Sequence, residues 1–407
     1  MILAADPLYV GDFAGDLAIT LLKVVVAFAF LLVAVMLMIW FERKLISDMQ
    51  NRVGPNIAGP WGIFQTLADG IKLFFKEDLV PDESDRFVFK LAPYLSLVPA
   101  FLVFAIVPLG GDFNRAEDPG VVTIFGHDTL LQVADPPMGV LFFLAMSSVA
   151  IYGVMLAGWG SGSKYPLLGS VRASAQMVSY EAALGLAVAA VVLVSGSLST
   201  HEIVVDQGGD GFGSFIPNWN IVVTGFVPFV IFLIAGTAEL NRPPFDLVEA
   251  EQELVGGFHT EYSSIRFALF FLAEFMNTIT MSAIIVTLFL GGPTGPALFL
   301  PEGWWVGMIW FFVKLMVFLF VFVWFRATLP RFRYDQLMDL GWKFLIPLAL
   351  GWFLFLGALS VADDQGWNPV IVVAATVVVG VLAAALLGGA IRTARRERLA
   401  EEVSPHG

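Results

Sequence analysis

The sequence contains no cysteine, few histidines and little charge. The lack of cysteine excludes disulfides and any thiolate-ligated iron–sulfur cluster on this chain. Only 14% of the residues are charged. The four histidines, His127, His201, His259 and His406, are far apart and no two are spaced four residues apart, so no metal site is indicated. If the chain takes part in redox chemistry, another polypeptide carries the electrons.

Apolar residues dominate what remains. They make up 58% of the chain, and the mean hydropathy is +0.81, which is typical of integral membrane proteins. Runs of about 20 apolar residues, the length that crosses a bilayer, occur near 17–40, 87–109, 137–159, 173–196, 219–240, 265–290, 304–326, 342–361 and 368–390. The N-terminus lacks the basic region of a cleaved signal peptide. We therefore expect an all-α polytopic membrane protein with about nine transmembrane helices.

Lysine and arginine are distributed unevenly between the two sides of these spans. If the N-terminus lies outside the cell, 19 of the 22 basic residues fall in or beside inward loops or in the C-terminal tail. Arg115 lies in an outward loop, and Lys23 and Lys314 lie within spans. Because basic residues are retained on the cytoplasmic side, the sequence predicts an outside N-terminus and a cytoplasmic C-terminus.

The first inward loop contains a second kind of helix, in PWGIFQTLADGIKLFFKEDL at residues 60–79. Apolar side chains recur at helical spacing on one face, and charged ones fall on the other. The apolar set is Phe64, Leu67, Ala68, Ile71, Phe74 and Phe75, and the charged set is Asp69, Lys72 and Lys76. The segment is too short and too charged to span. We expect an amphipathic helix on the cytoplasmic membrane surface, where it can form the lip of a cavity for an amphiphile.

Two glutamates and a lysine lie well inside predicted spans. Glu181 lies about 10 Å inside the fourth span and Glu274 about 15 Å inside the sixth, at the usual helical rise; Lys314 lies near the middle of the seventh. Each costs about 2.5–3.5 kcal/mol to insert. Two interpretations are open: Lys314 pairs with a carboxylate and pins helices together, or these groups form a proton path, since buried carboxyls can exchange protons near neutral pH.

The fifth span ends in an acidic segment, ELNRPPFDLVEAEQELVGGFHTEY, residues 239–262. It places six carboxylates beside one arginine; they are Glu239, Asp246, Glu249, Glu251, Glu253 and Glu261. If residues 246–255 are helical, Glu249 and Glu253 share a face, and their repulsion increases the affinity of the group for protons. A solvated acidic loop is the alternative. The apolar residues interleaved with the acids favour a loop packed against the helices or a partner.

Five inward segments together resemble one family. They are FERKLISDMQNRVGPNIAGPWG (41–62), ADGIKLFFKED (68–78), GSKYPLLGSVRASAQMVSYE (162–181), AELNRPPFDLVEAEQELVGGFHTEY (238–262) and RATLPRFRYDQLMDLGWK (326–343). They resemble the bacterial H-subunit family of the membrane arm of respiratory complex I, the proton-translocating NADH:quinone oxidoreductase. The resemblance extends from about residue 17 to about residue 361, within a predicted core of residues 1–361.

The resemblance implies a subunit without redox centres of its own, at the junction of the peripheral and membrane arms. Its inward loops, 41–86, 160–173, 241–264 and 327–341, would form a quinone chamber roofed by peripheral-arm subunits. Iron–sulfur clusters and flavin would lie on those partners, and the substrate would be menaquinone or ubiquinone. Further partners would be neighbouring membrane-arm subunits and lipid, in the bacterial plasma membrane; nucleic acid is not implied.

The resemblance also implies roles for individual residues. Those of the quinone chamber and its counter-charges are Glu42, Arg43, Arg52, Asp69, Glu77, Arg172, Arg242, Phe245, Arg326 and Arg331. Those of the proton path and coupling are Glu181, Glu239, Asp246, Glu249, Glu251, Glu253, Glu261, Glu274 and Lys314. No metal site is implied.

Residues 362–407 depart from the family pattern, which closes after eight spans. They supply the ninth predicted span and a charged tail. Two other functions share the buried carboxylates. A homologous subunit of a membrane-bound hydrogenase, or of a dehydrogenase with another donor, would share the fold, and a free-standing cation/proton antiporter would function alone. Co-purifying subunits distinguish them.

Overall fold

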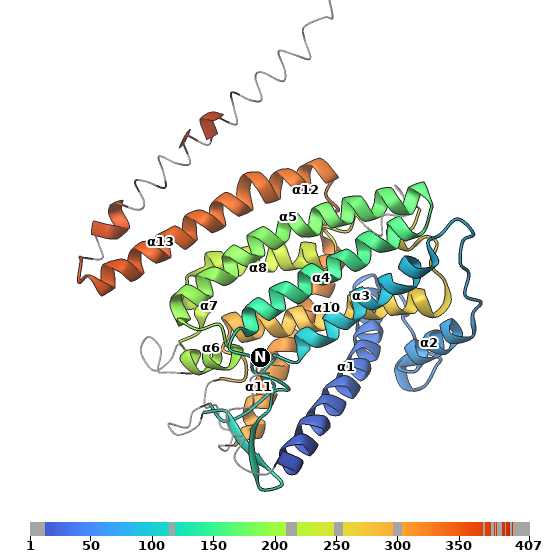
Figure 1. Cartoon of the computed structure of the whole chain (residues 1–407), viewed down its shortest axis with the longest axis horizontal. Helices are drawn as coiled ribbons and strands as arrows, with labels where there is room; N and C mark the ends of the chain where they lie inside the picture. The colour runs from blue at the N-terminus through green and yellow to red at the C-terminus, as the bar shows by residue number, and fades with distance from the viewer. Residues whose placement is uncertain are drawn as a thin grey trace, which may run out of the picture.

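The computed structural model describes residues 13–113, 119–208, 218–247, 255–295 and 303–368, with short stretches between 371 and 393. Within these residues, most of the chain forms long helices (Figure 1). Seven are long and apolar enough to cross a membrane, and a shorter apolar helix joins them. The prediction of an all-α polytopic membrane protein is confirmed.

Eight of the nine predicted spans coincide with helices. Six are single helices: α1 (Phe13–Met49), α3 (Arg86–Phe104), α4 (Gly139–Gly160), α5 (Lys164–Ser195), α10 (Ser264–Phe289) and α11 (Trp304–Thr328). Helix α5 begins nine residues before the predicted apolar run at 173, because Lys164 and Arg172 extend it beyond the hydrophobic stretch. The ninth predicted span, 368–390, lies largely outside the described residues and stays a prediction.

The fifth span is interrupted. A short turn, α7 (Asn220–Val223), is followed by α8 (Phe226–Glu239). Gly225 separates them with φ 78°, a conformation that favours glycine, and a Cβ there would lie 2.8 Å from the Trp352 ring. The indole of Trp352 donates to the carbonyl of Thr224 at 2.8 Å. The break therefore follows from close packing of the last span.

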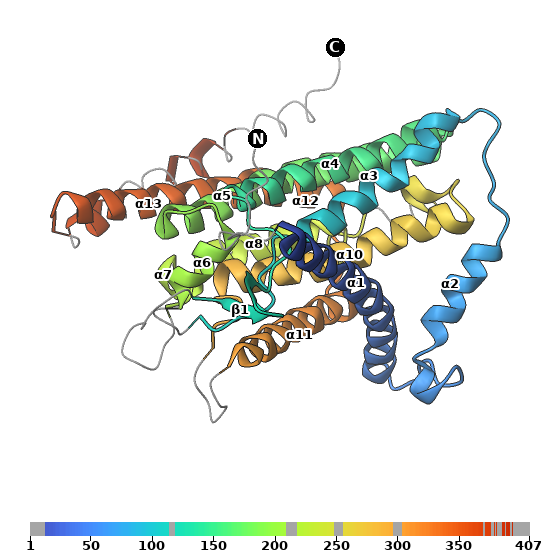
Figure 2. The same ribbon diagram turned by 60° about the horizontal axis from the view of Figure 1, so that its bottom comes forward.

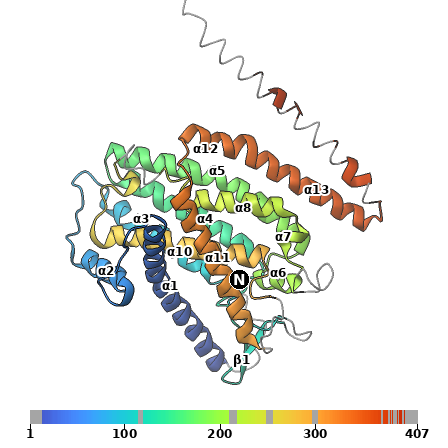
Figure 3. The same cartoon turned by 180° about the vertical axis from the view of Figure 1, so that it is seen from behind.

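The last described span has three parts. Helix α12 (Tyr334–Leu340) continues through a π-helical turn, Gly341–Leu345, into α13 (Ile346–Asp364). Pro347, at the start of α13, lacks the N–H that a regular helix would donate backwards. Figure 3 shows α13 along the edge of the bundle beside α5, with which it is in contact.

The helices fall into two groups. Helices α3, α4, α5, α8, α10 and α13 run in similar directions, whereas α1 and α11 cross them steeply (Figure 1). The two crossing helices contact each other and α10. Helix α10 is the central element, because it also packs against α3 and its span is the most buried of the seven.

Successive loops were predicted to lie on opposite sides of the membrane, and in the structure they lie at opposite ends of the bundle. At one end, the amide of Asp85 donates to the carbonyl of Gly160 at 3.0 Å; at the other, the amide of Val140 donates to the carbonyl of Leu198 at 3.0 Å. We call the first, which also contains residues 241–247, the loop end. The second is the hairpin end: it carries a two-stranded antiparallel sheet of β1 (Val121–Ile124) and β2 (His127–Leu130), paired Val121 to Leu130.

The amphipathic helix α2 (Gln65–Phe75) lies at the loop end, outside the bundle (Figure 2). It follows a 3₁₀ turn at Pro60–Gly62. The indole of Trp40 on α1 donates to the carbonyl of Trp61 at 2.9 Å. On the other side, the hydroxyl of Ser264, at the start of α10, donates to the carbonyl of Lys76 at 2.7 Å. Hydrogen bonds therefore attach the residues before α2 to α1 and the residue after α2 to α10.

A polar cluster fixes the hairpin end. The hydroxyl of Ser199, the N-cap of α6 (Thr200–Gln207), donates to the carboxylate of Asp135 at 2.8 Å. The side chain of Gln132 donates to Thr200 at 2.9 Å and to the carbonyl of Ile106 at 2.8 Å. Burial raises the pKa of Asp135 above its usual value.

Asp135→Asn is expected to flatten the dependence of thermal stability on pH. Because the folded pKa of Asp135 is raised, its contribution is fully present below the ordinary aspartate pKa of about 4 and is lost as pH rises through the folded value. Melting temperatures of the purified protein from pH 4 to 7 test this, with Asp128→Asn, at an exposed site on β2, as the control. An unchanged slope in Asp135→Asn would contradict the account.

Candidate functional site

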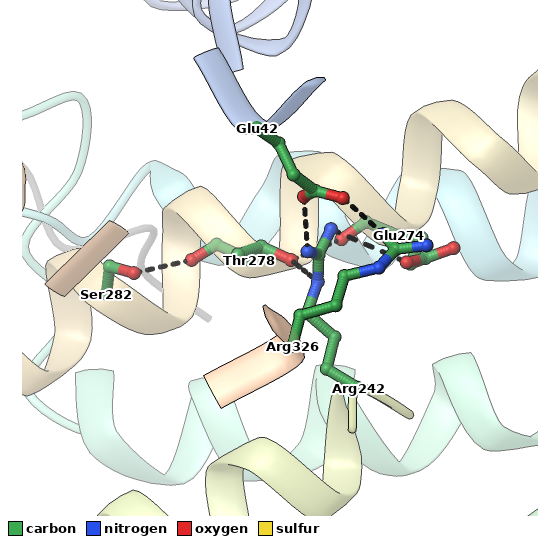
Figure 4. A network of polar contacts seen from close by, with 6 residues as sticks. All are labelled: Glu42, Arg242, Glu274, Thr278, Ser282 and Arg326. Atoms are coloured by element: carbon green, nitrogen blue, oxygen red, sulfur yellow. Dashed lines mark hydrogen bonds and ion pairs between the residues drawn. The ribbon is translucent and has the colours of Figure 1, made fainter. Parts of the chain in front are cut away.

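A buried ion-pair cluster lies where α1, α10, α11 and the segment after α8 meet. We call it the Arg242 cluster; its members are Glu42, Arg242, Glu274 and Arg326 (Figure 4). Arg242 is 1% exposed, and Glu42 is 5% exposed. Charges this deep are tolerated only when they are paired. The cluster brings together residues up to 284 positions apart in the sequence.

Arg242 is the centre of the cluster. Its Nη1 lies 2.6 Å from Glu42 Oε2, and its Nη2 lies 3.5 Å from Glu274 Oε1. Its Nε donates to the hydroxyl of Thr278 at 3.1 Å. The other oxygen of Glu42 accepts from Arg326. One guanidinium therefore bridges a carboxylate on α1 and a carboxylate on α10.

The chain after α8 turns sharply to place Arg242. Asn241 has φ 52°, and the amide of Arg242 donates to the carbonyl of Thr237 at 3.3 Å. Gln176 on α5, fully buried, donates to the carbonyls of Ala238 and Phe245, both at 2.8 Å. One glutamine thus holds both ends of this turn. Residues 242–247 are all buried, which confirms the predicted packing for this part of the acidic segment.

A cavity of about 270 Å³ adjoins the Arg242 cluster. Glu274 and Glu239 both line it, together with Ser96, Asn277 and aromatic residues of α10. The hydroxyl of Ser96 is buried without a hydrogen-bond partner among the described residues. A space of this size with several polar side chains on its wall can hold water. Glu274 therefore faces Arg242 on one side and shares a cavity with Glu239 on the other.

Beyond the cavity, two serines of α4 hold two glutamates. Ser147 donates to Glu239, at the end of α8, and Ser148 donates to Glu181 on α5. A second cavity of about 30 Å³ is lined by Ser147 and Glu239. The carboxylates Glu42, Glu274, Glu239 and Glu181 thus form a series across the molecule, connected by Arg242, the larger cavity and the serines. We call this the carboxylate row.

Two loop residues belong to the same end of the molecule. Asp246 is 2% exposed and lies 2.9 Å from Arg331, after α11. The Phe245 ring lies between those of Tyr180 and Phe332, at 5.3 and 5.6 Å. The buried loop and the segment after α11 are therefore joined by an ion pair and by ring contacts.

The other predicted chamber residues, near α2 and at the start of α5, are more exposed than the Arg242 cluster. Arg43 pairs with Asp69 at 2.6 Å and so connects α1 to α2. Arg52 and Glu77 are exposed. Arg172 on α5 lies over the ring of Tyr334 at 5.7 Å. These residues surround the loop end without joining the Arg242 cluster.

Lys314 lies apart from the carboxylate row. Its Nζ donates to the carbonyls of Leu290, Gly292 and Thr294, the first at 2.6 Å, and lies 4.5 Å from the Trp219 ring. Because α11 runs antiparallel to α10, this position meets the C-terminal end of α10, whose unpaired carbonyls attract a cation. Among the described residues, Lys314 has no carboxylate partner, so the interpretation in which it pairs with one is not supported; its role in a proton path stays a prediction.

The remaining predicted acids are placed only in part. Glu249, Glu251 and Glu253 lie outside the described residues, so their predicted helical face stays a prediction. Glu261 is partly buried, beside the 3₁₀ turn Gly257–His259. The carboxylate row, as the structure describes it, therefore does not include Glu249, Glu251 or Glu253.

Sequence reasoning missed the polar residues that hold the site. They are Ser96, Ser147, Ser148, Gln176, Asn277 and Thr278, and each is a polar side chain within an apolar helix. Such a residue is itself a signal, because an uncharged polar group in a span needs a partner. The sequence does not identify that partner.

The chain resembles curated bacterial proteins along nearly its whole length. A family model described as NADH dehydrogenase matches residues 22–357. The NADH-quinone oxidoreductase H-subunit of Frankia alni is 49% identical over 420 residues, covering 99% of this chain and 89% of that protein. The protein of the same name from Cutibacterium acnes is 45% identical and covers 94% of this chain and 86% of its own length. The Frankia alignment extends beyond residue 361, so that relative shares part of the C-terminal extension.

Proposed function

The chain belongs to the H-subunit family of NADH-quinone oxidoreductase, and on this basis we propose that it couples quinone reduction to proton translocation. The observation that carries the proposal is the carboxylate row. It begins at Glu42, beside the loop end, and continues through Arg242, Glu274 and the larger cavity to Glu239; Glu181 on α5 is held by Ser148, next to the serine that holds Glu239. Charge changes near Arg242 can therefore be passed across the membrane domain.

The loop end is the proposed quinone side. Five apolar residues of α2 and the turn before it are at least half exposed: Phe64, Leu67, Ile71, Phe74 and Phe75. An amphipathic helix with an uncovered apolar face suits a long-chain amphiphile or the lipid it dissolves in. Arg43 and Asp69 join this helix to α1 one residue from Glu42. A chamber between α2 and the loop end would place a quinone close to the Arg242 cluster.

Quinone chemistry supplies the driving event. Reduction of a quinone to a quinol takes up two electrons and two protons. The electrons would come from an iron–sulfur cluster on a peripheral-arm partner, since this chain has no cysteine. Proton demand beside Asp246 and Arg242 would change the charge of the loop, and Glu274 would respond through its shared guanidinium. The cavity would let water carry protons between Glu274 and Glu239.

The proposal includes a sidedness. The distribution of lysine and arginine supports a cytoplasmic loop end, an outside hairpin end and a cytoplasmic C-terminus, within a bacterial plasma membrane. Peripheral-arm subunits would cover the loop end. Neighbouring membrane-arm subunits and lipid would contact the sides of the bundle, and menaquinone or ubiquinone would be the substrate.

Purification of the tagged chain in mild detergent tests the proposal. We expect flavin and iron–sulfur proteins to co-purify with it, and the preparation to reduce a quinone analogue with NADH. A chain that purifies alone and exchanges cations for protons in liposomes would instead support a free-standing antiporter. Co-purification with a hydrogenase, and electron input from hydrogen, would support a related complex; the names of the relatives favour NADH.

A further inference from the structure

Helix α4 carries two adjacent serines in an otherwise apolar sequence. It contains no charged residue, and Ser147 and Ser148 are its only serines. Successive side chains on an α-helix point about 100° apart. Adjacent serines can therefore reach two different neighbouring helices.

Each serine contacts a different member of the carboxylate row. Ser147 Oγ donates to Oε1 of Glu239 on α8, and Ser148 Oγ donates to Oε1 of Glu181 on α5. Neither glutamate has a lysine or arginine partner among the described residues, in contrast to Glu42 with its two arginines. The serine hydroxyls thus replace counter-charges at this end of the row.

Ser148 has a second acceptor. Its Oγ also lies 3.1 Å from the carbonyl of Leu144, one turn earlier on α4. A hydroxyl has one proton, which it can donate to only one acceptor at a time. When Glu181 is ionised, Ser148 donates to it. When Glu181 is protonated, the acid donates to Ser148 Oγ and the serine proton rotates to the Leu144 carbonyl.

We propose that Ser147 and Ser148 are positioning residues that hold Glu239 and Glu181 in place as these acids change protonation. Ser148 satisfies Glu181 in both states by rotation of its hydroxyl, and no proton is transferred to the serine. Ser147 has no second acceptor among the described residues, so it holds Glu239 chiefly as the anion, beside the smaller cavity. This inference rests on the proposed coupling function of the row.

The test uses the complete complex in sealed membrane vesicles, with Ser148→Ala and Ser147→Ala as the variants. Loss of one hydrogen bond to a charged group is expected to slow proton translocation roughly tenfold. The corresponding threonine variants retain the hydroxyl and should recover most of the rate. Ser195→Ala is the matched control, because Ser195, at the hairpin end of α5, donates to the carbonyl of Val191 at 3.1 Å and contacts no carboxylate of the row.

Infrared difference spectra report the hydrogen bonding of Glu181 directly, and a serine that only packed against α5 would not affect this signal. In Ser148→Ala, the carbonyl stretch of protonated Glu181 should shift to higher frequency, because the acid loses its partner; Ser148→Thr should restore it. Wild-type rates and an unshifted band in Ser148→Ala would overturn the proposal. An equal loss of assembled complex in the alanine and threonine variants would also overturn it, because the threonine keeps the hydroxyl. Failure of the proposed function would appear separately, as a lack of NADH:quinone reductase activity with the wild-type chain.

Discussion

Arg242→Gln is expected to destabilise the protein by about 3–5 kcal/mol, the usual effect of removing one partner from a buried ion pair. Glu42 would keep only Arg326, whose side chain is 34% exposed, and Glu274 would lose its cation. Glu42 is 5% exposed and Arg242 packs 4.8 Å from the Phe275 ring, so the loss of the guanidinium leaves the Glu42 carboxylate buried with one fewer cation. The measurements are the yield of assembled complex and its thermal stability in detergent.

Two further variants make this prediction specific. Arg326→Gln should cost clearly less, because the arginine is nearer to solvent and Arg242 still neutralises Glu42. Glu42→Gln combined with Arg242→Gln should recover part of the loss, because both charges are then removed. Arg242→Gln as stable as Arg326→Gln would show that the cluster does not depend on the buried guanidinium.

Glu239→Gln is expected to lower proton translocation tenfold or more, as a rough guide from other positioned acids and bases. The glutamine has nearly the same size and can still accept from Ser147, so packing around α8 should change little. It cannot bind and release a proton. Because Glu239 lines both cavities, its loss would interrupt the row between Glu274 and Glu181. Coupled quinone reduction should slow as well, while the amount of assembled complex stays near that of the wild type.

The helices and their alternation could be predicted because the membrane imposes their length. Eight apolar runs became helices, and their ends meet as the charge distribution requires. Boundaries were less predictable where helices extend past the hydrocarbon, as at Lys164, or where packing interrupts them, as at Gly225. The β-hairpin at Val121–Leu130 was not predicted, because four-residue strands carry too little pattern.

Glu181 and Glu274 could be identified from the sequence alone, since an ionisable group in a span is costly enough to imply a role, whereas Glu42, Arg242 and Arg326 followed only from the family resemblance. The pairings of these residues could not be identified. Lys314 and Glu274 lie at similar positions within their helices, yet only Glu274 joins the Arg242 cluster, because the antiparallel packing of α10 and α11 separates the two. Ser147, Ser148 and Gln176 are ordinary residues in sequence and acquire meaning only from the carboxylates and carbonyls that they contact.

The most direct test of the coupling role is the rate of NADH-driven proton translocation per assembled complex in sealed vesicles carrying Glu239→Gln. Glu202→Gln, an exposed glutamate at the hairpin end, is the matched control. The carboxylate row predicts that translocation is largely lost in Glu239→Gln and unchanged in Glu202→Gln. Wild-type translocation by fully assembled Glu239→Gln complexes would contradict a proton path through this row.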